Sequence, residues 1–160
     1  MIESTESTLS TSELIRTVGA LVVRWQDSTQ MLDEAVGELY GLSASERHCL
    51  SFLWPGPQSA TAIARAIRLT PAAVTALIDR LEKRGYVVRQ PDPDDRRKVL
   101  VAASTRTAEL TREVYEPLGR RGAELLSQFS DDELRAFIRM LEASVEMQQQ
   151  QLEELAARKP

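Results

Sequence analysis

Residues 69–88 decide the fold, and they read LTPAAVTALIDRLEKRGYVV. Thr70 followed by Pro71 is a typical helix start, because a threonine side chain can cap early amides and proline suits the first helical position. Gly85 is a typical helix end, because glycine readily adopts the left-handed cap. The apolar residues between them recur every three or four positions, at Val74, Leu77, Ile78 and Leu81. The stretch therefore predicts a helix with one buried face.

A second, shorter helix is predicted just before this one. Ser59 can cap it, and its apolar face would consist of Ile63, Ala64 and Ile67. Only a brief break at residues 68–69 separates the two helices. Two helices joined by so short a turn are a candidate helix-turn-helix.

A β-hairpin is predicted directly after the helix-turn-helix. Residues 86–90 and 99–101 are rich in β-prone side chains, and residues 91–95 between them are rich in turn formers. The tip of this hairpin is acidic and then basic. A hairpin in this place is the wing of a winged helix-turn-helix.

Three capping boxes predict further helix starts, at Ser10, Ser43 and Ser130. In each of them a serine and a glutamate three residues later satisfy early helix amides. The first box opens a long amphipathic helix that ends near Gly41. The second opens a short helix over about residues 44–54, which Pro-Gly-Pro then stops.

The C-terminal third is predicted to be helical as well. One helix covers about residues 105–129, and the third capping box opens a last helix that runs toward Leu155. Bends are expected in the first of these, at Pro117, Gly119 and Gly122. The predicted fold class is therefore mainly α with a small β-hairpin wing.

Composition limits the class of protein. The chain has 160 residues, one cysteine and a formal net charge of −4. A single cysteine excludes an internal disulfide and a Cys-rich metal site, so neither a metal nor a cofactor is predicted. No apolar run approaches the roughly 20 residues that cross a bilayer, and residues 1–12 lack the features of a secretory signal. We therefore expect a cytoplasmic protein with no membrane partner.

The charge is unevenly distributed along the chain. Residues 58–106 hold ten Lys/Arg and five Asp/Glu, a surplus of five positive charges. The rest of the chain holds ten Lys/Arg and nineteen Asp/Glu, a surplus of nine negative charges. A basic centre between acidic flanks fits a nucleic-acid contact that is confined to the centre.

Residues 69–88 resemble the recognition helix of the multiple-antibiotic-resistance regulator (MarR) family. Residues 92–101, DPDDRRKVLV, resemble that family's wing, with its Asp-x-Arg element at Asp95 and Arg97. The chain departs from the family pattern at Arg68, where a glycine is common. The resemblance implies a homodimer that binds pseudo-palindromic promoter DNA, and such dimers are often released by a small ligand or by thiol oxidation.

The resemblance also implies how the chain is divided. Residues 1–11 are expected to be a flexible N-terminus, and residues 12–160 a single domain. Within that domain, residues 12–41 and 105–157 would form the dimerisation helices of a winged helix-turn-helix protein. Residues 43–104 would form the winged helix-turn-helix lobe.

The outward face of the helix over residues 71–83 is predicted to enter a major groove of double-stranded DNA. Its first residues are small, so the helix can approach the base edges closely. Threonines could bond to bases or phosphates, alanines could touch thymine methyls, and the cations suit phosphates. The alternative is a solvated polar face on an ordinary helical domain. The predicted contacts from this region are Arg65, Thr70, Pro71, Ala72, Ala73, Thr75, Ala76, Arg80 and Lys83.

The predicted wing contacts are Asp95, Arg96, Arg97 and Lys98. Asp95 and Arg97 are two residues apart, which in a hairpin places them on the same side. Their pair would aim the guanidinium at the narrow, electronegative minor groove of A/T-rich DNA, with Arg96 and Lys98 on phosphates. The pattern alone does not separate Arg96 from Arg97. The alternative is a surface salt bridge worth about 0–1 kcal/mol.

Three side chains outside these motifs are candidates for other roles. Cys49 falls on the apolar register of its helix, which favours a buried structural thiol over a redox switch. His48 is its neighbour, about 100° away around the helix, so the two cannot form a catalytic dyad. Trp25 and His48 are predicted to line an effector pocket. The alternatives are a plain core position for Trp25 and a surface position for His48.

The sequence therefore favours a DNA-binding transcription regulator, a homodimeric repressor of the stress- or drug-response type, with a small-molecule effector. The alternative is a helical protein-interaction module, an antirepressor or adaptor, with degenerate DNA binding. The acidic flanks and the scarcity of base-reading side chains argue for that alternative. An enzyme is not predicted, because the sequence offers no nucleophile–base pair, metal cluster or phosphate loop.

Overall fold

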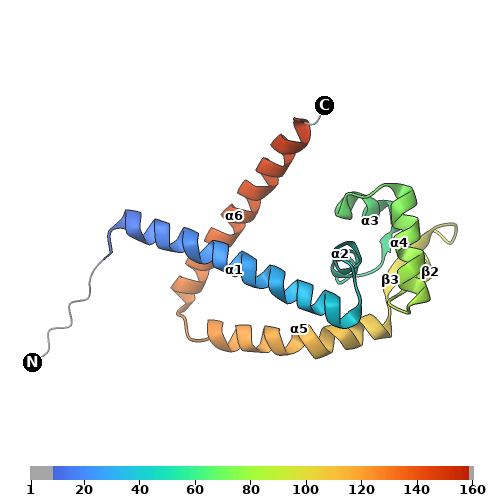
Figure 1. Cartoon of the computed structure of the whole chain (residues 1–160), viewed down its shortest axis with the longest axis horizontal. Coiled ribbons are helices and arrows are strands. Elements are labelled where there is room, and N and C mark those ends of the chain that lie inside the picture. Colours follow the sequence, from blue (N-terminus) through green and yellow to red (C-terminus); the bar gives the residue numbers. More distant parts are fainter. Residues whose placement is uncertain (1–8, 159–160) are drawn as a thin grey trace, which may run out of the picture. The chain divides into compact units, whose positions relative to one another are not determined.

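A computed structural model describes residues 9–158, in nine helices and strands. The described residues form two compact units, one within Met1–Glu109 and the other within Leu110–Pro160. The elements are α1 (Thr11–Tyr40), α2 (Ala44–Phe52), β1 (Gln58–Ser59), α3 (Ala60–Ile67), α4 (Pro71–Lys83), β2 (Val87–Pro91), β3 (Val99–Ala103), α5 (Thr105–Leu126) and α6 (Asp131–Ala157) (Figure 1). The prediction of a mainly α fold with a small wing is confirmed.

All three predicted capping boxes are present. The backbone amides of Ser10, Ser43 and Ser130 each donate to the glutamate three residues later, at 2.8 Å. α1 ends where it was expected, with Gly41 in the left-handed conformation at φ 61°. Of the predicted flexible segment 1–11, residues 1–8 lie outside the described residues, whereas residue 10 caps α1 and residue 11 begins it.

α3 and α4 form the predicted helix-turn-helix. Their axes meet at 107°, within the range that is usual for this motif (Figure 1). The hydroxyl of Ser59 caps α3 at the amide of Ala62, and that of Thr70 caps α4 at the amide of Ala73. Pro71 is the first residue of α4, as predicted.

The wing belongs to a three-stranded antiparallel sheet with the strand order β1-β3-β2. β2 and β3 pair from Val87 opposite Ala103 to Pro91 opposite Val99. The two-residue strand β1 pairs with β3 through Gln58 opposite Val101 and was not predicted. A strand this short has no alternation of its own, so only its partner defines it.

The core of the first unit lies along one face of α4. All four residues of its predicted stripe are at most 1% exposed. The large side chains that are fully buried are Leu53, Ile63, Val74, Leu77, Ile78, Leu81, Tyr86, Val87 and Cys49. The helical period of α4 is therefore fixed by its packing, and its opposite face points away from the core.

Tyr86 joins the ends of several elements. Its hydroxyl donates to the carbonyl oxygen of Tyr40 at 3.2 Å, and its own carbonyl accepts from the hydroxyl of Thr107. The guanidinium carbons of Arg84 and Arg106 lie 5.1 and 4.6 Å from the centre of its ring. These contacts connect the end of α1, the end of α4, the start of β2 and the start of α5.

The second unit consists of most of α5 and all of α6. α5 continues through Pro117 to Leu126, three residues short of the predicted end at residue 129, and the expected bends stay a prediction. None of the residues of α6 is buried in the single chain. Its exposed large apolar side chains are Phe137, Ile138, Met140, Val145, Met147, Leu152 and Leu155.

Among the described residues, no single helix is both long enough and apolar enough to cross a membrane. α3 and α4 together reach the required length and composition, but they are bent by 107° where they meet. Both helices contribute buried side chains to the core of the first unit.

Cys49 is fully buried, as predicted, and we expect its thiol to be inert at neutral pH. Burial, with a smaller effect of the Glu46 carboxylate, raises the pKa of Cys49 from 9.0 to about 11. In the unfolded chain the thiol loses its proton at the lower pH, so the contribution of Cys49 to stability is lost as pH rises from about 9 to 11. Denaturant unfolding at several pH values should show this loss in the wild type and a smaller loss in Cys49→Ala. Equal losses in the two proteins would contradict it.

Gly37 should be required for the packing of α2 on α1. A Cβ at this position would overlap the guanidinium of Arg47 and lie 2.8 Å from the carbonyl oxygen of Leu42. Gly37→Ala is therefore expected to lower the free energy of unfolding by about 1–3 kcal/mol, although alanine is the better helix former. Gly19→Ala is the matched control in the same helix, because nothing lies within 4 Å of a Cβ there. It should raise that free energy by about 0.5–1 kcal/mol, and equal effects of the two changes would refute the packing argument.

Candidate nucleic-acid interface

The face of α4 opposite the core carries most of the predicted groove contacts. Pro71, Ala72, Thr75 and Ala76 are exposed, together with the cap residue Thr70, whereas Ala73 is half-buried. These side chains are short, so the helix backbone can come close to a flat or grooved partner. The predicted outward face is thus present as a surface of small side chains.

The two threonine hydroxyls on this face already have partners within the helix. The hydroxyl of Thr70 accepts from the amide of Ala73 at 3.3 Å. The hydroxyl of Thr75 donates its proton to the carbonyl oxygen of Pro71 at 3.0 Å. A hydroxyl has one proton and two lone pairs, so Thr75 offers a partner an acceptor and a methyl group but no donor.

Glu46 faces two arginines, Arg80 in α4 and Arg84 at the C-cap of that helix. Its side chain is only 7% exposed, and its carboxylate lies 3.7 Å from Arg80 and 3.6 Å from Arg84. Oε2 of the same carboxylate accepts from the amide of Ser43 in the capping box of α2. Arg80 itself remains 59% exposed, so it is aimed by a buried charge and stays open to solvent.

Glu46 was not predicted from the sequence to belong to this surface. It was assigned only to a capping box, which uses one carboxylate oxygen and leaves the other available. A glutamate that caps one helix and faces arginines from another is visible only once the two helices are packed.

Arg89 on β2 connects the wing to α4. Its guanidinium pairs with Asp79 at 2.5 Å and also with Glu82, one turn further along α4. The hydrogen bond that Arg89 donates to Asp79 is the main reason why the pKa of Arg89 is raised. This bridge was not predicted from the sequence, because ten residues separate Arg89 from Asp79 and only the packing of β2 on α4 brings them together.

The predicted Asp95–Arg97 pair is present in the wing. Oδ1 of Asp95 accepts from the backbone amide of Arg97 at 3.1 Å and from its Nε at 3.4 Å, and Nζ of Lys98 lies 3.6 Å from Oδ2. Asp95 is half-buried, whereas the Arg97 side chain is 93% exposed. The wing therefore presents an arginine whose backbone amide and Nε are held by Asp95, while most of its side chain is exposed to solvent.

The reason given for this pair was wrong in one respect. Strand alternation was expected to place the two side chains on one side, but residues 92–98 form the loop between β2 and β3. Oδ1 of Asp92 accepts from the amides of Asp94 and Asp95, and the amide of Lys98 donates to the carbonyl of Asp95. A turn closed by aspartate, rather than the pleat, brings Asp95 and Arg97 together.

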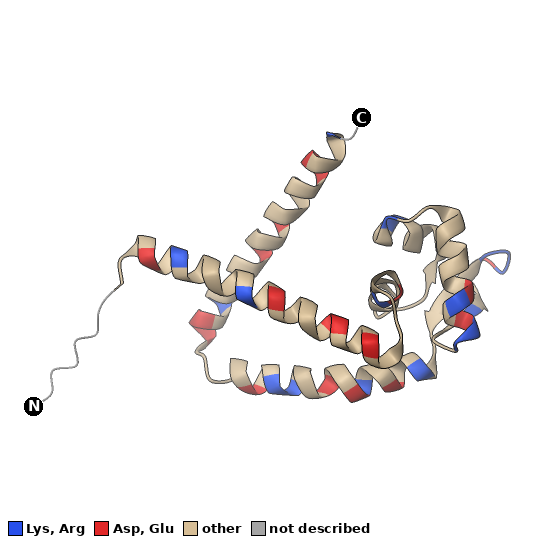
Figure 2. Cartoon of the chain, viewed as in Figure 1, with Lys and Arg blue, Asp and Glu red and all other residues tan. Residues whose placement is uncertain are grey.

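The remaining predicted cations lie around the α4 face. Arg65 on α3 and Lys83 at the end of α4 are exposed, and so is Arg96 in the loop of the wing. Figure 2 shows this clustering of Lys and Arg at the end of α4 and in the wing. The structure therefore brings exposed cations from α3, α4 and the wing into one lobe.

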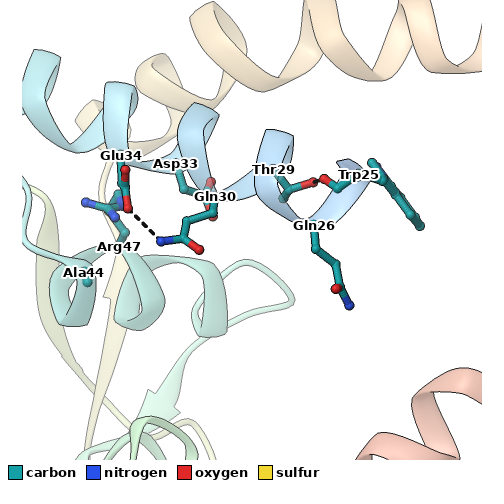
Figure 3. Close-up of a pocket in the computed structure, with 8 residues that line it drawn as sticks. All are labelled: Trp25, Gln26, Thr29, Gln30, Asp33, Glu34, Ala44 and Arg47. Carbon is teal, nitrogen blue, oxygen red and sulfur yellow. Dashed lines mark hydrogen bonds between the residues drawn. The ribbon is translucent and has the colours of Figure 1, made fainter. Parts of the chain in front are cut away.

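A hollow of about 540 Å³ lies between α1 and α2. Trp25, which is 57% exposed, lies at one end of the group of lining residues, and Arg47 lies near the other end (Figure 3). His48 is exposed and is not among the lining residues, so of the two predicted pocket residues only Trp25 lies there. The lining residues are Trp25, Gln26, Thr29, Gln30, Asp33, Glu34, Ala44 and Arg47.

The hollow combines an aromatic ring with charged and amide groups. Nε2 of Gln30 donates to Oε1 of Glu34 at 2.9 Å (Figure 3), and the guanidinium of Arg47 donates to the carbonyl of Leu42 at 2.9 Å. Within residues 9–158, no group of three or more His, Cys, Asp or Glu side chains is placed to hold a metal ion. The hollow thus offers stacking and hydrogen bonding to an organic molecule.

Comparison with known proteins agrees with this architecture. Residues 42–99 match the model of the MarR family. The chain is 29% identical over 147 residues to the HTH-type transcriptional regulator YcgE of Bacillus subtilis, covering 91% of this chain and 96% of that protein. It is 30% identical over 122 residues to the HTH-type transcriptional regulator PecS of Dickeya dadantii, covering 70% and 74%.

Solved structures show the same fold. A MarR-like transcriptional regulator of Thermotoga maritima matches with a TM-score of 0.59 at 25% identity, over 88% of this chain and 98% of that one. A MepR mutant of S. aureus, bound to an oligodeoxyribonucleotide, matches with a TM-score of 0.51 at 20% identity, over 90% and 99%. The chain belongs to the MarR family and is a DNA-binding transcription regulator of the winged helix-turn-helix type.

Proposed function

We propose that this chain is a homodimeric repressor that binds a pseudo-palindromic operator and releases it when a small molecule occupies the α1–α2 hollow. The observation that carries this proposal is the pairing of two surfaces in one lobe. One is the small-residue face of α4, and the other is the exposed Arg97, which Asp95 anchors in the wing. We assign the regulator to the stress- or drug-response type, acting on chromosomal DNA in the cytoplasm.

α4 would enter the major groove with its first two turns against the bases. Ala72 and Ala76 can contact thymine methyls, and Thr75 can accept a hydrogen bond from a base amino group. Arg65, Arg80 and Lys83 would lie on phosphates, which fix the position of the helix. Because residues 58–106 carry a surplus of five positive charges, the lobe would attract DNA despite the acidic total.

The wing would supply a large part of the specificity. α4 presents few hydrogen-bond donors to base edges, so the major-groove contacts alone discriminate weakly. Arg97 can enter a minor groove, where an arginine responds to the groove's width and so favours A/T-rich sequence. Arg96 and Lys98 would hold the flanking phosphates.

The scarcity of donors on α4 also supports a second candidate, an antirepressor or adaptor with degenerate DNA binding.

Dimerisation would use residues 12–41 and 105–157, leaving residues 43–104 as the DNA-binding lobe. α1 and, separately, α6 expose rows of large apolar side chains in the single chain. Apolar patches of this extent are typical of protein–protein contacts. A second copy of the chain is the occupant that a two-fold operator requires, since it would present two identical recognition helices.

The effector would bind against Trp25 in the hollow. The wall of the hollow includes Ala44 and Arg47, and Glu46 lies in the same turn of α2, next to Arg47. Glu46 faces Arg80 on α4. A ligand that moved the first turn of α2 would therefore also move the carboxylate that aims a DNA-binding arginine.

Substitution of Arg97 should reduce the preference for A/T-rich flanks. Arg97→Ala is expected to cost about 1–3 kcal/mol per contact on an A/T-flanked operator and less on a G/C-flanked one. Lys83→Ala, the matched loss of a phosphate contact, should weaken binding to both duplexes alike and reduce the salt slope by about 0.9 per contact. Binding of both variants is measured on both duplexes at several salt concentrations. If Arg97→Ala keeps the wild-type flank preference, the wing does not determine that preference. If the wild type binds both duplexes equally, the adaptor with degenerate DNA binding is favoured.

Dimerisation should depend on the apolar stripe of α6. Val145 is 54% exposed on that stripe, so Val145→Glu would place a charge in the proposed interface. We expect a shift from dimer to monomer or aggregate by sedimentation, with weaker operator binding. Gln150→Glu adds the same charge to the opposite face of α6 and should leave the dimer intact. A Val145→Glu protein that remained dimeric with wild-type affinity would exclude this interface.

A further inference from the structure

Arg68 occupies a backbone conformation that ordinarily suits glycine. It lies in the turn between α3 and α4 at φ 54° and ψ 41°, and its amide donates to the carbonyl of Ala64 as the C-cap of α3. Within residues 9–158 it is the one residue other than glycine with a positive φ. Left-handed geometry brings Cβ close to the following carbonyl, so an arginine is less stable here than a glycine would be.

Beyond this backbone cap, no contact of the Arg68 side chain with the described residues compensates for the strain. The Arg68 side chain is exposed, and none of the described residues forms an ion pair or a hydrogen bond with its guanidinium. Two other exposed arginines of the lobe differ in this respect, since Arg80 faces Glu46 and Arg97 is anchored by Asp95. A strained residue without an internal partner is a reason to look for a partner outside the chain.

The surroundings of Arg68 favour an anionic partner. Residues 58–78 contain Arg65 and Arg68 but no aspartate or glutamate. Figure 2 accordingly shows no acidic residue on α3 or at the start of α4. Arg68 is two residues before Thr70, the cap of the recognition helix. In a helix-turn-helix the first helix crosses the DNA backbone and the second enters the groove, so the turn between them lies beside the phosphates.

We infer that Arg68 binds a phosphate of the DNA backbone and fixes the depth and register at which α4 enters the groove. This inference rests on the proposed function, in which α4 is the helix that enters the groove. A guanidinium can donate two parallel hydrogen bonds to a phosphate, which makes it a stronger anchor than a neutral turn residue. The contact with DNA would thus offset the backbone strain at Arg68.

Arg68→Gly separates this role from a structural one, because stability and affinity should change in opposite directions. Relief of the strain should raise Tm by about 2–5 °C. Loss of the contact should weaken binding about tenfold per arginine and reduce the salt slope by about 0.9 per contact. The probe is a duplex that the wild-type protein selects from a random-sequence pool, compared with an unselected duplex of the same length. Since phosphates carry no sequence, both duplexes should lose affinity alike.

Two more variants and a control complete the experiment. Arg68→Asn tolerates the left-handed conformation but lacks the charge, so it should bind as weakly as Arg68→Gly. Arg68→Lys keeps the charge and should stay within about threefold of the wild type. Arg158→Gln removes an exposed arginine that lies outside the DNA-binding lobe and outside the proposed dimerisation segments, so it should leave affinity and salt slope unchanged.

Wild-type affinity and salt slope in Arg68→Gly or Arg68→Asn would overturn the inference while leaving the proposed function intact. A wild-type protein that selected no duplex would overturn both.

Discussion

The burial of one face of α4 is the constraint on which the rest of the lobe depends. Four of its side chains, at positions 74, 77, 78 and 81, are at most 1% exposed. Complete burial of such a side chain stabilises the fold by about 1.5–3 kcal/mol, whereas an exposed ion pair contributes about 0–1 kcal/mol. The core therefore sets the rotation of α4 about its axis, and the ion pairs around it only direct individual side chains. Once the apolar stripe is fixed inward, the small residues of the first turns have to face out.

The acidic residues of the lobe place its cations rather than simply reducing its charge. Asp79 and Glu82 engage Arg89 and so connect α4 with the wing, and Glu46 faces Arg80 from α2. Asp95 anchors Arg97 by one oxygen while most of that side chain stays exposed. A carboxylate that holds the inner part of an arginine side chain already restricts its rotamers, so the arginine loses less conformational entropy when it binds DNA. This accounts for a protein of net negative charge that still presents ordered cations on one lobe.

The parts of the fold that the sequence predicted are those specified by neighbouring residues. The serine–glutamate capping boxes, the Thr70-Pro71 helix start and the stripe of α4 all depend on spacings of one turn or less. The Glu46–Arg80 and Arg89–Asp79 contacts were missed because each needs two packed elements. His48 shows the same limit, since helical spacing does not tell which face of α2 meets α1, and the structure places Arg47 rather than His48 at the hollow. The Asp95–Arg97 pair was found for the wrong reason, because a turn and not a strand joins them.

The internal hydrogen bonds of the threonines determine how this lobe can discriminate between DNA sequences. Thr75 has given its proton to the carbonyl of Pro71, so the exposed face of the first two turns of α4 consists largely of methyl groups and acceptor oxygens. Methyl groups distinguish thymine from cytosine only by contact, and contact requires that the helix be held at one depth in the groove. In the proposed complex that depth would be set by groups that bind the DNA backbone on both sides of the helix, the turn before α4 on one side and the wing after it on the other. Discrimination by this lobe would therefore come from the rigid spacing between its backbone anchors.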